Sequence, residues 1–514
     1  MFGITEASLL EECHKLISRY ERYSRELRKD DVRRRRRLVE PNVGVLLRPS
    51  YWRVDSSFDP FRVRASASSI TRAVNLAIRN GDYRPGAPIA HLVRKPSGGS
   101  RTVSIFPIVD AVVSRTVFNS LSEKNRALGS ARSYAYRSDL STHDAIQYIA
   151  REFDTVDRVF VAEYDFSSFF DSISHEYLWD SLEHNRFLTT REEKSVLAAF
   201  MAASIQTESD YDRWASRPGR RVGIPQGTSV SLFLANAAAW ELDRDLERLG
   251  VGFVRYADDT LIWSRDYGQI AQAANVLKRA SRRIGAELNP DKSRGIRLFT
   301  PRREPAEIDS TDEINFVGYR FVRGKVGLRG EVVDRIKTRV VRLVWSNLLQ
   351  APQQRTFNPA RVAPSVDRDY VVLLLQLRRY LYGNLSEAKL RALEHGTVKR
   401  IRYPGIMSYF PLVNDEAQLK SFDGWLVSVI HQALAKRAKL IAPVTGSALP
   451  TPHGLTKAEL LKAQATTADG TLIDLRVPSI ARFSSVLLRA ANEYGANAIS
   501  RGNGATEYQY LVSQ

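Results

Sequence analysis

The stretch that most constrains how this chain can fold is Phe253–Trp263, where two short apolar runs meet at the adjacent carboxylates Asp258 and Asp259. Side chains alternate between two faces on either side of the pair, which predicts a tight β-hairpin with both acids at its tip. Two like charges beside a buried sheet repel each other, so the simplest stabilising partner is a divalent cation held by oxygen ligands. Taken alone, the pair is more typical of an ordinary hairpin turn, because turns favour Asp.

A third carboxylate lies earlier in the chain. Residues 158–165 are dense in β-formers and predict a strand that carries Asp165 at its carboxyl end. If this strand is a neighbour of the hairpin in one antiparallel sheet, Asp165 reaches Asp258 and Asp259. Three carboxylates could then hold two Mg²⁺ ions, with Mn²⁺ as an alternative, for in-line phosphoryl transfer. We therefore predict these three acids as metal ligands and catalytic residues, and expect Asp171 to be structural.

The composition indicates a large protein with an anionic partner. The chain has 514 residues, is 43% hydrophobic and has a formal net charge of +19, so it can bury a core and should attract a polyanion such as nucleic acid. No apolar run of about 18 residues and no signal-peptide pattern is present, which predicts a cytoplasmic protein that does not enter a membrane. The single cysteine, Cys13, excludes a disulfide framework and a multi-cysteine zinc site.

The N-terminal region predicts a helix and a basic segment. Apolar spacing from Thr5 to Arg28 is that of an amphipathic helix, with Cys13 among its core positions. The five arginines Arg33–Arg37 are typical of a solvated face, and a phosphate-contacting arm is the alternative. The polar stretch Pro41–Asp59 is expected to be a linker or an extended arm.

Two glycine-containing segments could approach a ligand. Residues 90–106 predict a hairpin with Lys95 and Arg101 close to its turn, and such cations could reach a triphosphate, although a solvated hairpin is equally consistent. In Gly223–Gly227 the glycines permit close backbone approach and Gln226 is a fixed amide. A long helix is predicted from residue 229 to 249.

The remaining segments complete one sheet and add helices. A turn after the helix at residues 270–284 comes back towards the sheet and presents Lys292, and residues 315–328 predict another hairpin. From residue 332 onwards the pattern is almost wholly helical, and a helical clamp or an oligomerisation body is its simplest interpretation.

The order of these segments resembles that of the reverse transcriptases, between about Tyr83 and Phe321. Tyr256–Asp259 is similar to the family's Tyr-x-Asp-Asp box, and Asp165 is followed by an aromatic residue, Phe170, that the resemblance makes the steric gate against a 2′-hydroxyl. The resemblance implies two further sets of residues. The nucleotide-binding set is Lys95, Arg101, Phe166, Phe170, Gln226, Gly227 and Lys292, and the primer-grip set is Phe316, Gly318 and Tyr319.

The resemblance also implies an α+β fold, a right-hand polymerase whose fingers and palm combine an antiparallel sheet with helices, followed by an all-helical C-terminal domain. The expected domains are a helical N-terminal extension with a basic arm (1–60), fingers (61–157), a palm (158–330, with a fingers insertion at about 176–222) and a thumb-like helical domain (331–514).

The implied activity is that of a nucleotidyltransferase, an RNA-directed DNA polymerase that uses deoxynucleoside triphosphates, with an RNA template and/or a single-stranded DNA product. The basic arm, complete palm and helical C-terminal half are similar to the bacterial abortive-infection and defence-associated reverse transcriptases, AbiK and its relatives. That similarity implies antiviral defence, homo-oligomers and protein-primed or untemplated synthesis. The alternatives are a group II intron-like or retron-like reverse transcriptase, an RNA-dependent RNA polymerase and an inactive RNA-binding scaffold.

Overall fold

The computed structural model of the chain describes residues 2–37, 47–94, 99–213, 218–301, 308–362, 366–383, 385–445, 449–466, 470–495 and 498–501. The buried apolar side chains among these residues form two hydrophobic cores. One core lies among the N-terminal helices and one face of the central sheet, and the other joins the opposite face of that sheet to the C-terminal helices.

The N-terminal helix α1 (Glu6–Arg37) is longer than the predicted one, which ended near Arg28. It continues through Arg33–Arg37, whose side chains lie outside the described part of the chain. The prediction that Cys13 is a core residue is confirmed, because Cys13 is buried together with Leu9 and Ile17. Helices α2 (Pro60–Ala65) and α3 (Ala67–Asn80) pack against α1.

The prediction of a linker or arm at Pro41–Asp59 is wrong for residues 47–59, the part that is described. This part forms two short 3₁₀ turns, η1 (Ser50–Arg53) and η2 (Ser56–Phe58). Trp52 and Phe58 are buried there, with their rings 5.6 Å from Tyr20 and 5.5 Å from Tyr211, respectively. Burial of two large aromatic side chains fixes this segment on the body of the protein.

The predicted glycine-turn hairpin is present as strands β1 (Ile89–Arg94) and β2 (Ser100–Ile105), which pair antiparallel. Lys95 falls in residues 95–98, outside the described residues. The hairpin is followed by α4 (Ile108–Lys124), the 3₁₀ turn η3 (Arg126–Leu128) and α5 (Thr142–Asp154). Helix α5 begins at a capping box in which Ser141 and Asp144 satisfy each other's backbone amides.

The central sheet has the strand order β4-β5-β3-β6-β7 and is antiparallel except for the last pair. Its strands are β3 (Val159–Tyr164), β4 (Gly252–Tyr256), β5 (Asp259–Ser264), β6 (Arg294–Phe299) and β7 (Ser310–Thr311). The pairing of β3 with β5 confirms that the strand ending before Asp165 neighbours the Asp-Asp hairpin. Apolar side chains on both faces are buried, which is why β5 is almost continuously apolar.

Helices cover the face of the sheet that carries Phe253 and Ile262. They are α6 (Phe169–Ser172), α7 (His175–His184), α8 (Arg191–Ala202), α9 (Ser229–Ala238), α10 (Trp240–Leu249) and α11 (Tyr267–Ile284). The helix predicted at 229–249 is therefore interrupted at Ala239. Just after the break, the Trp240 indole donates a hydrogen bond of 2.7 Å to the carbonyl of Leu128.

A three-stranded sheet leads into the C-terminal helices. It contains β8 (Ile314–Phe316), β9 (Tyr319–Val322) and β10 (Lys325–Leu328). The helical elements that follow are α12 (Gly330–Val344), the π-helical turn η4 (Trp345–Leu349), α13 (Gln350–Gln353), η5 (Pro359–Arg361), α14 (Arg368–Tyr382), α15 (Glu387–Glu394), η6 (Ile406–Tyr409), α16 (Glu416–Thr445), α17 (Lys457–Leu460) and α18 (Ile480–Tyr494).

Short strands lie among the helices of the C-terminal region, which the sequence pattern predicted to be almost wholly helical and the resemblance implied to be all-helical. Strand β11 (Ile401–Tyr403) pairs with β14 (Ile499–Arg501), and β12 (Gln464–Thr466) pairs with β13 (Leu472–Asp474). These strands have three residues each, which is too short for an alternating pattern to stand out from a helical one.

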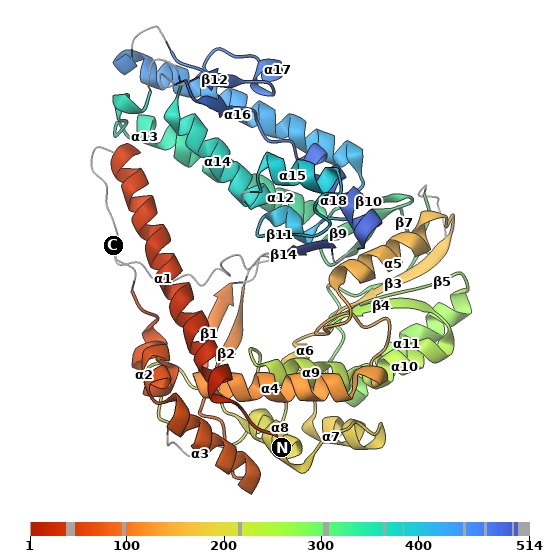
Figure 1. Cartoon of the computed structure of the whole chain (residues 1–514). Coiled ribbons are helices and arrows are strands. Elements are labelled where there is room, and N and C mark those ends of the chain that lie inside the picture. The colour runs from red at the N-terminus through yellow and green to blue at the C-terminus, as the bar shows by residue number, and fades with distance from the viewer. Residues whose placement is uncertain are drawn as a thin grey trace.

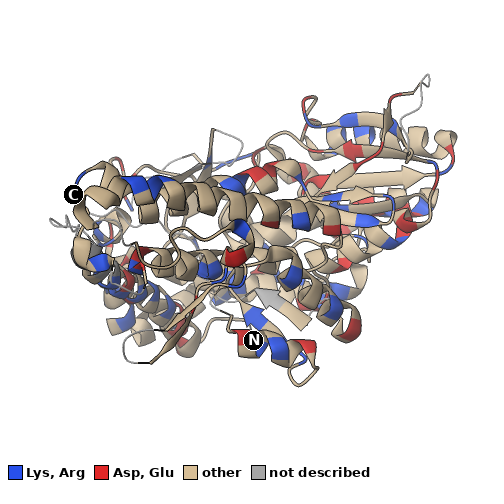
Figure 2. Cartoon of the chain, turned by 90° about the horizontal axis from the view of Figure 1, so that it is seen from above, with Lys and Arg blue, Asp and Glu red and all other residues tan. Residues whose placement is uncertain are grey.

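Figure 1 shows the C-terminal helices on one side and the central sheet with its helices on the other, while α1 runs along the molecule from α4 towards the C-terminal helices. Near its far end, Glu26 of α1 forms an ion pair of 3.2 Å with Arg379 of α14. Figure 2 shows Lys and Arg spread over the whole length of the molecule. No helix in the described residues is both long enough and apolar enough to cross a membrane.

Candidate active site

The two adjacent acids occupy the tight turn between β4 and β5. Tyr256 and Asp259 are paired across the hairpin, so the turn consists of Ala257 and Asp258. Ala257 has φ +60°, a left-handed conformation that a residue other than glycine rarely adopts. Tyr164, the last residue of β3, is paired with Thr260, so Asp165, which follows it, lies beside the end of β5 that begins with Asp259.

Asp165 is buried and is held by the turn at residues 287–293. Lys292 Nζ lies 2.8 Å from Asp165 Oδ2, and the Asn289 amide donates a hydrogen bond of 3.3 Å to the same oxygen. The Asn289 backbone N–H also donates to the Asp165 carbonyl at 2.8 Å, and the Asp165 N–H donates to Ser293 Oγ at 3.3 Å. Lys292 is therefore at the site, as predicted. Asn289 and Ser293 were missed, and the Asn-Pro pair was the only sequence signal for this turn.

The pKa values of the two turn acids are raised. Burial, with a further contribution from the charge of Asp165, raises the pKa of Asp258. Desolvation, the charge of Asp258 and the neighbouring Asp165 raise the pKa of Asp259 to about 7. Asp259 is exposed to water, yet enough protein surrounds its carboxyl to disfavour the charged form. The hydrogen bond with Asp165 raises the pKa of Lys292, so its ammonium stays charged beside these acids.

The three acids suit a hard divalent cation chemically. Among the described residues, no three His, Cys, Asp or Glu side chains are already arranged as a metal-binding group. Lys292 pairs with one oxygen of Asp165 instead. Burial first, and then the charge of a neighbouring carboxylate (Asp165 for Asp258, Asp258 and Asp165 for Asp259), raise the pKa values of both turn acids, and carboxylate oxygens are the ligands that Mg²⁺ prefers. A bound cation would relieve the repulsion between these carboxylates, so the donor set fits the predicted metal.

The Gly223–Gly227 loop lies against the backbone of Asp171 at one end and against strand β2 at the other. A Cβ at Gly223 would lie 2.5 Å from the carbonyl oxygen of Asp171, and one at Gly227 would lie 2.5 Å from that of Ser104 on β2. Both glycines have positive φ, so no other residue fits these positions without strain. The Gln226 amide donates a hydrogen bond of 3.3 Å to the Asp171 carboxylate, which gives Asp171 the structural role expected of it.

The other predicted nucleotide-binding residues differ in their surroundings. Arg101 is exposed on β2, and Phe170 is half-buried. Phe166 is buried, and its ring centroid lies 5.2 Å from that of Phe169, so its side chain belongs to the core. Lys95 is not described.

The predicted primer-grip residues form the β8–β9 hairpin. Val317 and Gly318 make its turn, and both have positive φ. The side chains of Phe316 and Tyr319 are buried, and the Tyr319 hydroxyl donates a hydrogen bond of 2.9 Å to the carbonyl of Tyr409. These rings therefore hold the hairpin on the C-terminal domain, and only the turn could meet a primer.

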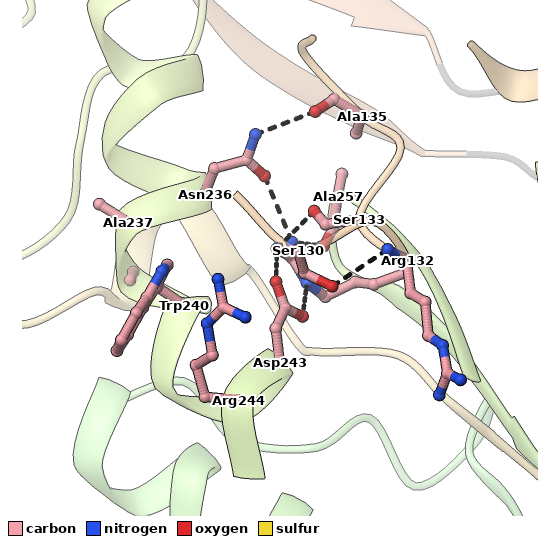
Figure 3. A network of polar contacts seen from close by, with 12 residues as sticks. Ser130, Arg132, Ser133, Ala135, Asn236, Ala237, Trp240, Asp243, Arg244 and Ala257 are labelled. Carbon is pink, nitrogen blue, oxygen red and sulfur yellow. Dashed lines mark hydrogen bonds and ion pairs between the residues drawn. The ribbon is translucent and has the colours of Figure 1, made fainter. Parts of the chain in front are cut away.

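A buried ion pair that sequence reasoning missed supports the Asp-Asp turn. Arg255 on β4 forms two hydrogen bonds of 2.6 Å with Asp243 on α10 and donates to the carbonyl of Ala257 at 3.0 Å. It also contacts Asn236 at 3.4 Å and Ser133 at 2.7 Å. Figure 3 shows Ser133, Asn236 and Asp243 close together beside Ala257. Because Arg255 is 1% exposed, these bonds lie in a medium that strengthens them. The Arg255 guanidinium thus ties the turn to α9, to α10 and to the loop at residue 133.

Residues 93–321 match the family described as reverse transcriptase (RNA-dependent DNA polymerase). This segment is therefore similar to a reverse transcriptase domain. The match spans under half of the chain, from the β1–β2 hairpin to β9, and includes all three acids. The fold is accordingly a polymerase fold of the reverse transcriptase type, with an antiparallel-rich sheet and many helices.

Solved structures with a distant likeness to the chain include two telomerases and a viral polymerase. Apo telomerase from Candida tropicalis truncated from its C-terminal domain has a TM-score of 0.37 at 12% identity, over 51% of this chain and 60% of that one. Telomerase from Candida albicans, in complex with a fragment of telomeric RNA, has a TM-score of 0.38 at 12% identity, over 74% and 68%. The RNA-dependent RNA polymerase of a human picobirnavirus has a TM-score of 0.37 at 14% identity, over 79% and 65%. No curated protein sequence matches this one.

Proposed function

We propose that this protein is an RNA-directed DNA polymerase that adds deoxynucleotides to a 3′ hydroxyl. The observation that carries the proposal is the meeting of Asp165 with Asp258 and Asp259 at adjoining ends of β3 and the β4–β5 hairpin. The reverse transcriptase match over residues 93–321 supports the same class of reaction. Three neighbouring carboxylates on a rigid sheet are what phosphoryl transfer requires of a protein, because the reaction depends on positioning and charge stabilisation.

The proposed metal ligands are Asp165, Asp258 and Asp259. When bound, Mg²⁺ would supply electrostatic stabilisation to the attacking and leaving oxygens of an in-line displacement. The chain's own contribution begins with Lys292, whose ammonium at 2.8 Å from Asp165 would face the departing pyrophosphate. In this proposal Arg101 contacts the triphosphate, Gln226 contacts the incoming nucleotide, and Phe170 excludes a 2′-hydroxyl.

The test is incorporation of labelled deoxynucleotides on an RNA template with a DNA primer in the presence of Mg²⁺. Wild type should extend the primer, and the Asp258→Ala plus Asp259→Ala variant should not. Asp245→Ala, which removes an acid of α10 away from the turn, is a matched control and should retain extension. Equal extension by wild type and the double variant would refute the proposal. RNA binding without extension by wild type under any primer condition would favour an inactive RNA-binding scaffold.

The defence-associated subclass is a narrower proposal. It rests on the similarity of the basic N-terminal segment, the complete palm and the helical C-terminal half to those of the AbiK group. In bacteria challenged with phage, expression of wild type should protect the culture, and the double variant should not. A peptide attached to the 5′ end of the DNA made in those cells would support protein priming. Extension restricted to one cognate structured RNA would favour the group II intron-like or retron-like alternative.

A further inference from the structure

Tyr136 has an unusual backbone conformation beside the candidate active site. It lies in the segment between η3 and α5 and has φ +62°, a left-handed conformation that is unfavourable for a residue with a side chain. Bulky residues persist in such conformations where the surrounding structure fixes them, and such positions cluster at ligand sites. Tyr136 is not among the residues that the resemblance implied.

The ring of Tyr136 contacts the predicted steric gate. Its centroid lies 6.5 Å from that of Phe170, with the rings at 80° in an edge contact. Phe169 makes a second edge contact with Phe170 at 6.1 Å and 84°. Phe170 therefore has an aromatic ring on each of two sides, one from its own helix and one from the Tyr136 segment. Edge contacts of this kind stabilise ring positions beyond the effect of the area that they bury.

Tyr136 also lies near the turn acids. It is half-buried, and burial, with a further contribution from the charge of Asp258, raises the pKa of Tyr136 to about 12. The positive charges of Arg255 and of Arg101 on β2 oppose that rise in pKa. Tyr136 thus stays neutral at physiological pH. It lies near Asp258 of the turn, Arg101 of the β1–β2 hairpin and the ring of Phe170.

The segment that carries Tyr136 is fixed to the turn acids by Arg255. The Tyr134 N–H donates a hydrogen bond of 3.0 Å to the Arg255 carbonyl, and the Arg255 guanidinium donates to Ser133 at 2.7 Å. On the other side, the Asn236 amide donates to the carbonyl of Ala135 at 2.9 Å (Figure 3). Since the same guanidinium holds the Asp-Asp turn through Ala257, the turn and the Tyr136 segment share one anchor.

We propose that Tyr136 is a positioning residue for sugar selection, which holds the Phe170 ring against the place of a nucleotide's 2′ carbon. The inference rests on the proposed polymerase function and adds a residue that determines its specificity. Without the Tyr136 ring, Phe170 is free to turn away on one side, and a ribonucleotide then fits. Tyr136 acts through Phe170, so its effect should vanish when the Phe170 ring is absent.

The experiment compares kcat/KM for dGTP and GTP on an RNA template, in wild type and in Tyr136→Gly. Glycine removes the ring and suits the left-handed backbone, so this variant should fold. The ratio of kcat/KM for dGTP to that for GTP should fall by about ten-fold, which is the usual effect of removing one packing contact from a substrate pocket. Tyr136→Phe keeps the ring and should keep the preference. Phe170→Ala should lower the preference as well, and adding Tyr136→Gly to it should change nothing further.

Tyr267→Ala is the matched control, because Tyr267 is 49% exposed and makes a similar edge contact with Phe160 at 5.4 Å on the palm sheet. It should leave the preference unchanged. If Tyr136→Gly polymerises with a preference within about two-fold of wild type, or lowers it equally when Phe170 is already Ala, the inference is overturned while the polymerase function stands. If wild type incorporates neither nucleotide, the proposed function fails, and the inference fails with it.

Discussion

Replacing Asp259 by Asn should stabilise the protein when no divalent cation is present. The pKa of Asp259 is raised from an ordinary value of 3.8 to about 7, so the folded chain holds a proton there that the unfolded chain releases. As pH rises from about 4 to 7, the folded state therefore loses stability at this position. At pH 8 the destabilisation is fully developed in wild type, and the neutral amide of the Asp259→Asn variant would not contribute to it.

The magnitude follows from the size of the shift. Three pKa units correspond to about 4 kcal/mol. Asp259 is exposed, however, so water screens much of the repulsion, and we expect about 1–2 kcal/mol. For a domain of the size of residues 93–321, that energy corresponds to a rise in Tm of about 2–8 °C.

The assay is thermal unfolding at pH 8 and at pH 5, in EDTA and in Mg²⁺. The Asn variant should unfold at a higher temperature than wild type in EDTA at pH 8, and the difference should shrink at pH 5, where wild-type Asp259 is protonated. Mg²⁺ should raise the Tm of wild type more than that of the variant, because binding to the folded state stabilises it. A variant less stable than wild type in EDTA at pH 8, or an identical response to Mg²⁺, would refute the reasoning.

Three further predictions concern charged residues outside the Asp-Asp turn. Arg255→Met should cost about 3–5 kcal/mol in denaturant unfolding, because it leaves a buried carboxylate unpaired, whereas Arg248→Met in an exposed pair should cost less than about 1 kcal/mol. Asp367 is buried with Arg437 and His453, and its pKa is lowered to about 2. Its contribution of about 2 kcal/mol to the free energy of unfolding should therefore disappear as pH falls from 4 to 2. The same contribution should be absent in Asp367→Asn. Lys292→Gln should lower kcat about 10²-fold with little change in Tm, since its ammonium is exposed; an unchanged kcat would remove it from the reaction.

The sheet and the three acids could be predicted because their signals are local. Strong β-formers before Asp165 and on each side of Asp258 define three strands, β3, β4 and β5, which pair with one another in the sheet. Close backbone approach at the glycines of the 223–227 loop was also predictable. In the structure, the backbone of Asp171 would meet any Cβ at Gly223. Local pattern therefore anticipated which backbone segments form the site.

What supports the site could not be predicted in the same way. The ion pair of Arg255 with Asp243 joins a strand to a helix, and nothing in the spacing of these residues distinguishes them from other charged pairs. Tyr136 has a positive φ, and the preceding residues Ser133 and Ala135 are hydrogen-bonded to separate segments of the chain. Burial of the Phe316 and Tyr319 rings depends on the C-terminal domain, whose packing the sequence pattern does not specify. Long-range packing decides these features.

Our central claim is that one carboxylate and a distant pair share divalent cations. The most direct measurement is a crystal structure of the wild-type protein with Mn²⁺ and a deoxynucleoside triphosphate, in which anomalous scattering locates the ions. We predict Mn²⁺ in contact with Asp165 and with at least one of Asp258 and Asp259, with the triphosphate beside it. Mn²⁺ bound only elsewhere, or a triphosphate seated away from these carboxylates, would contradict the claim.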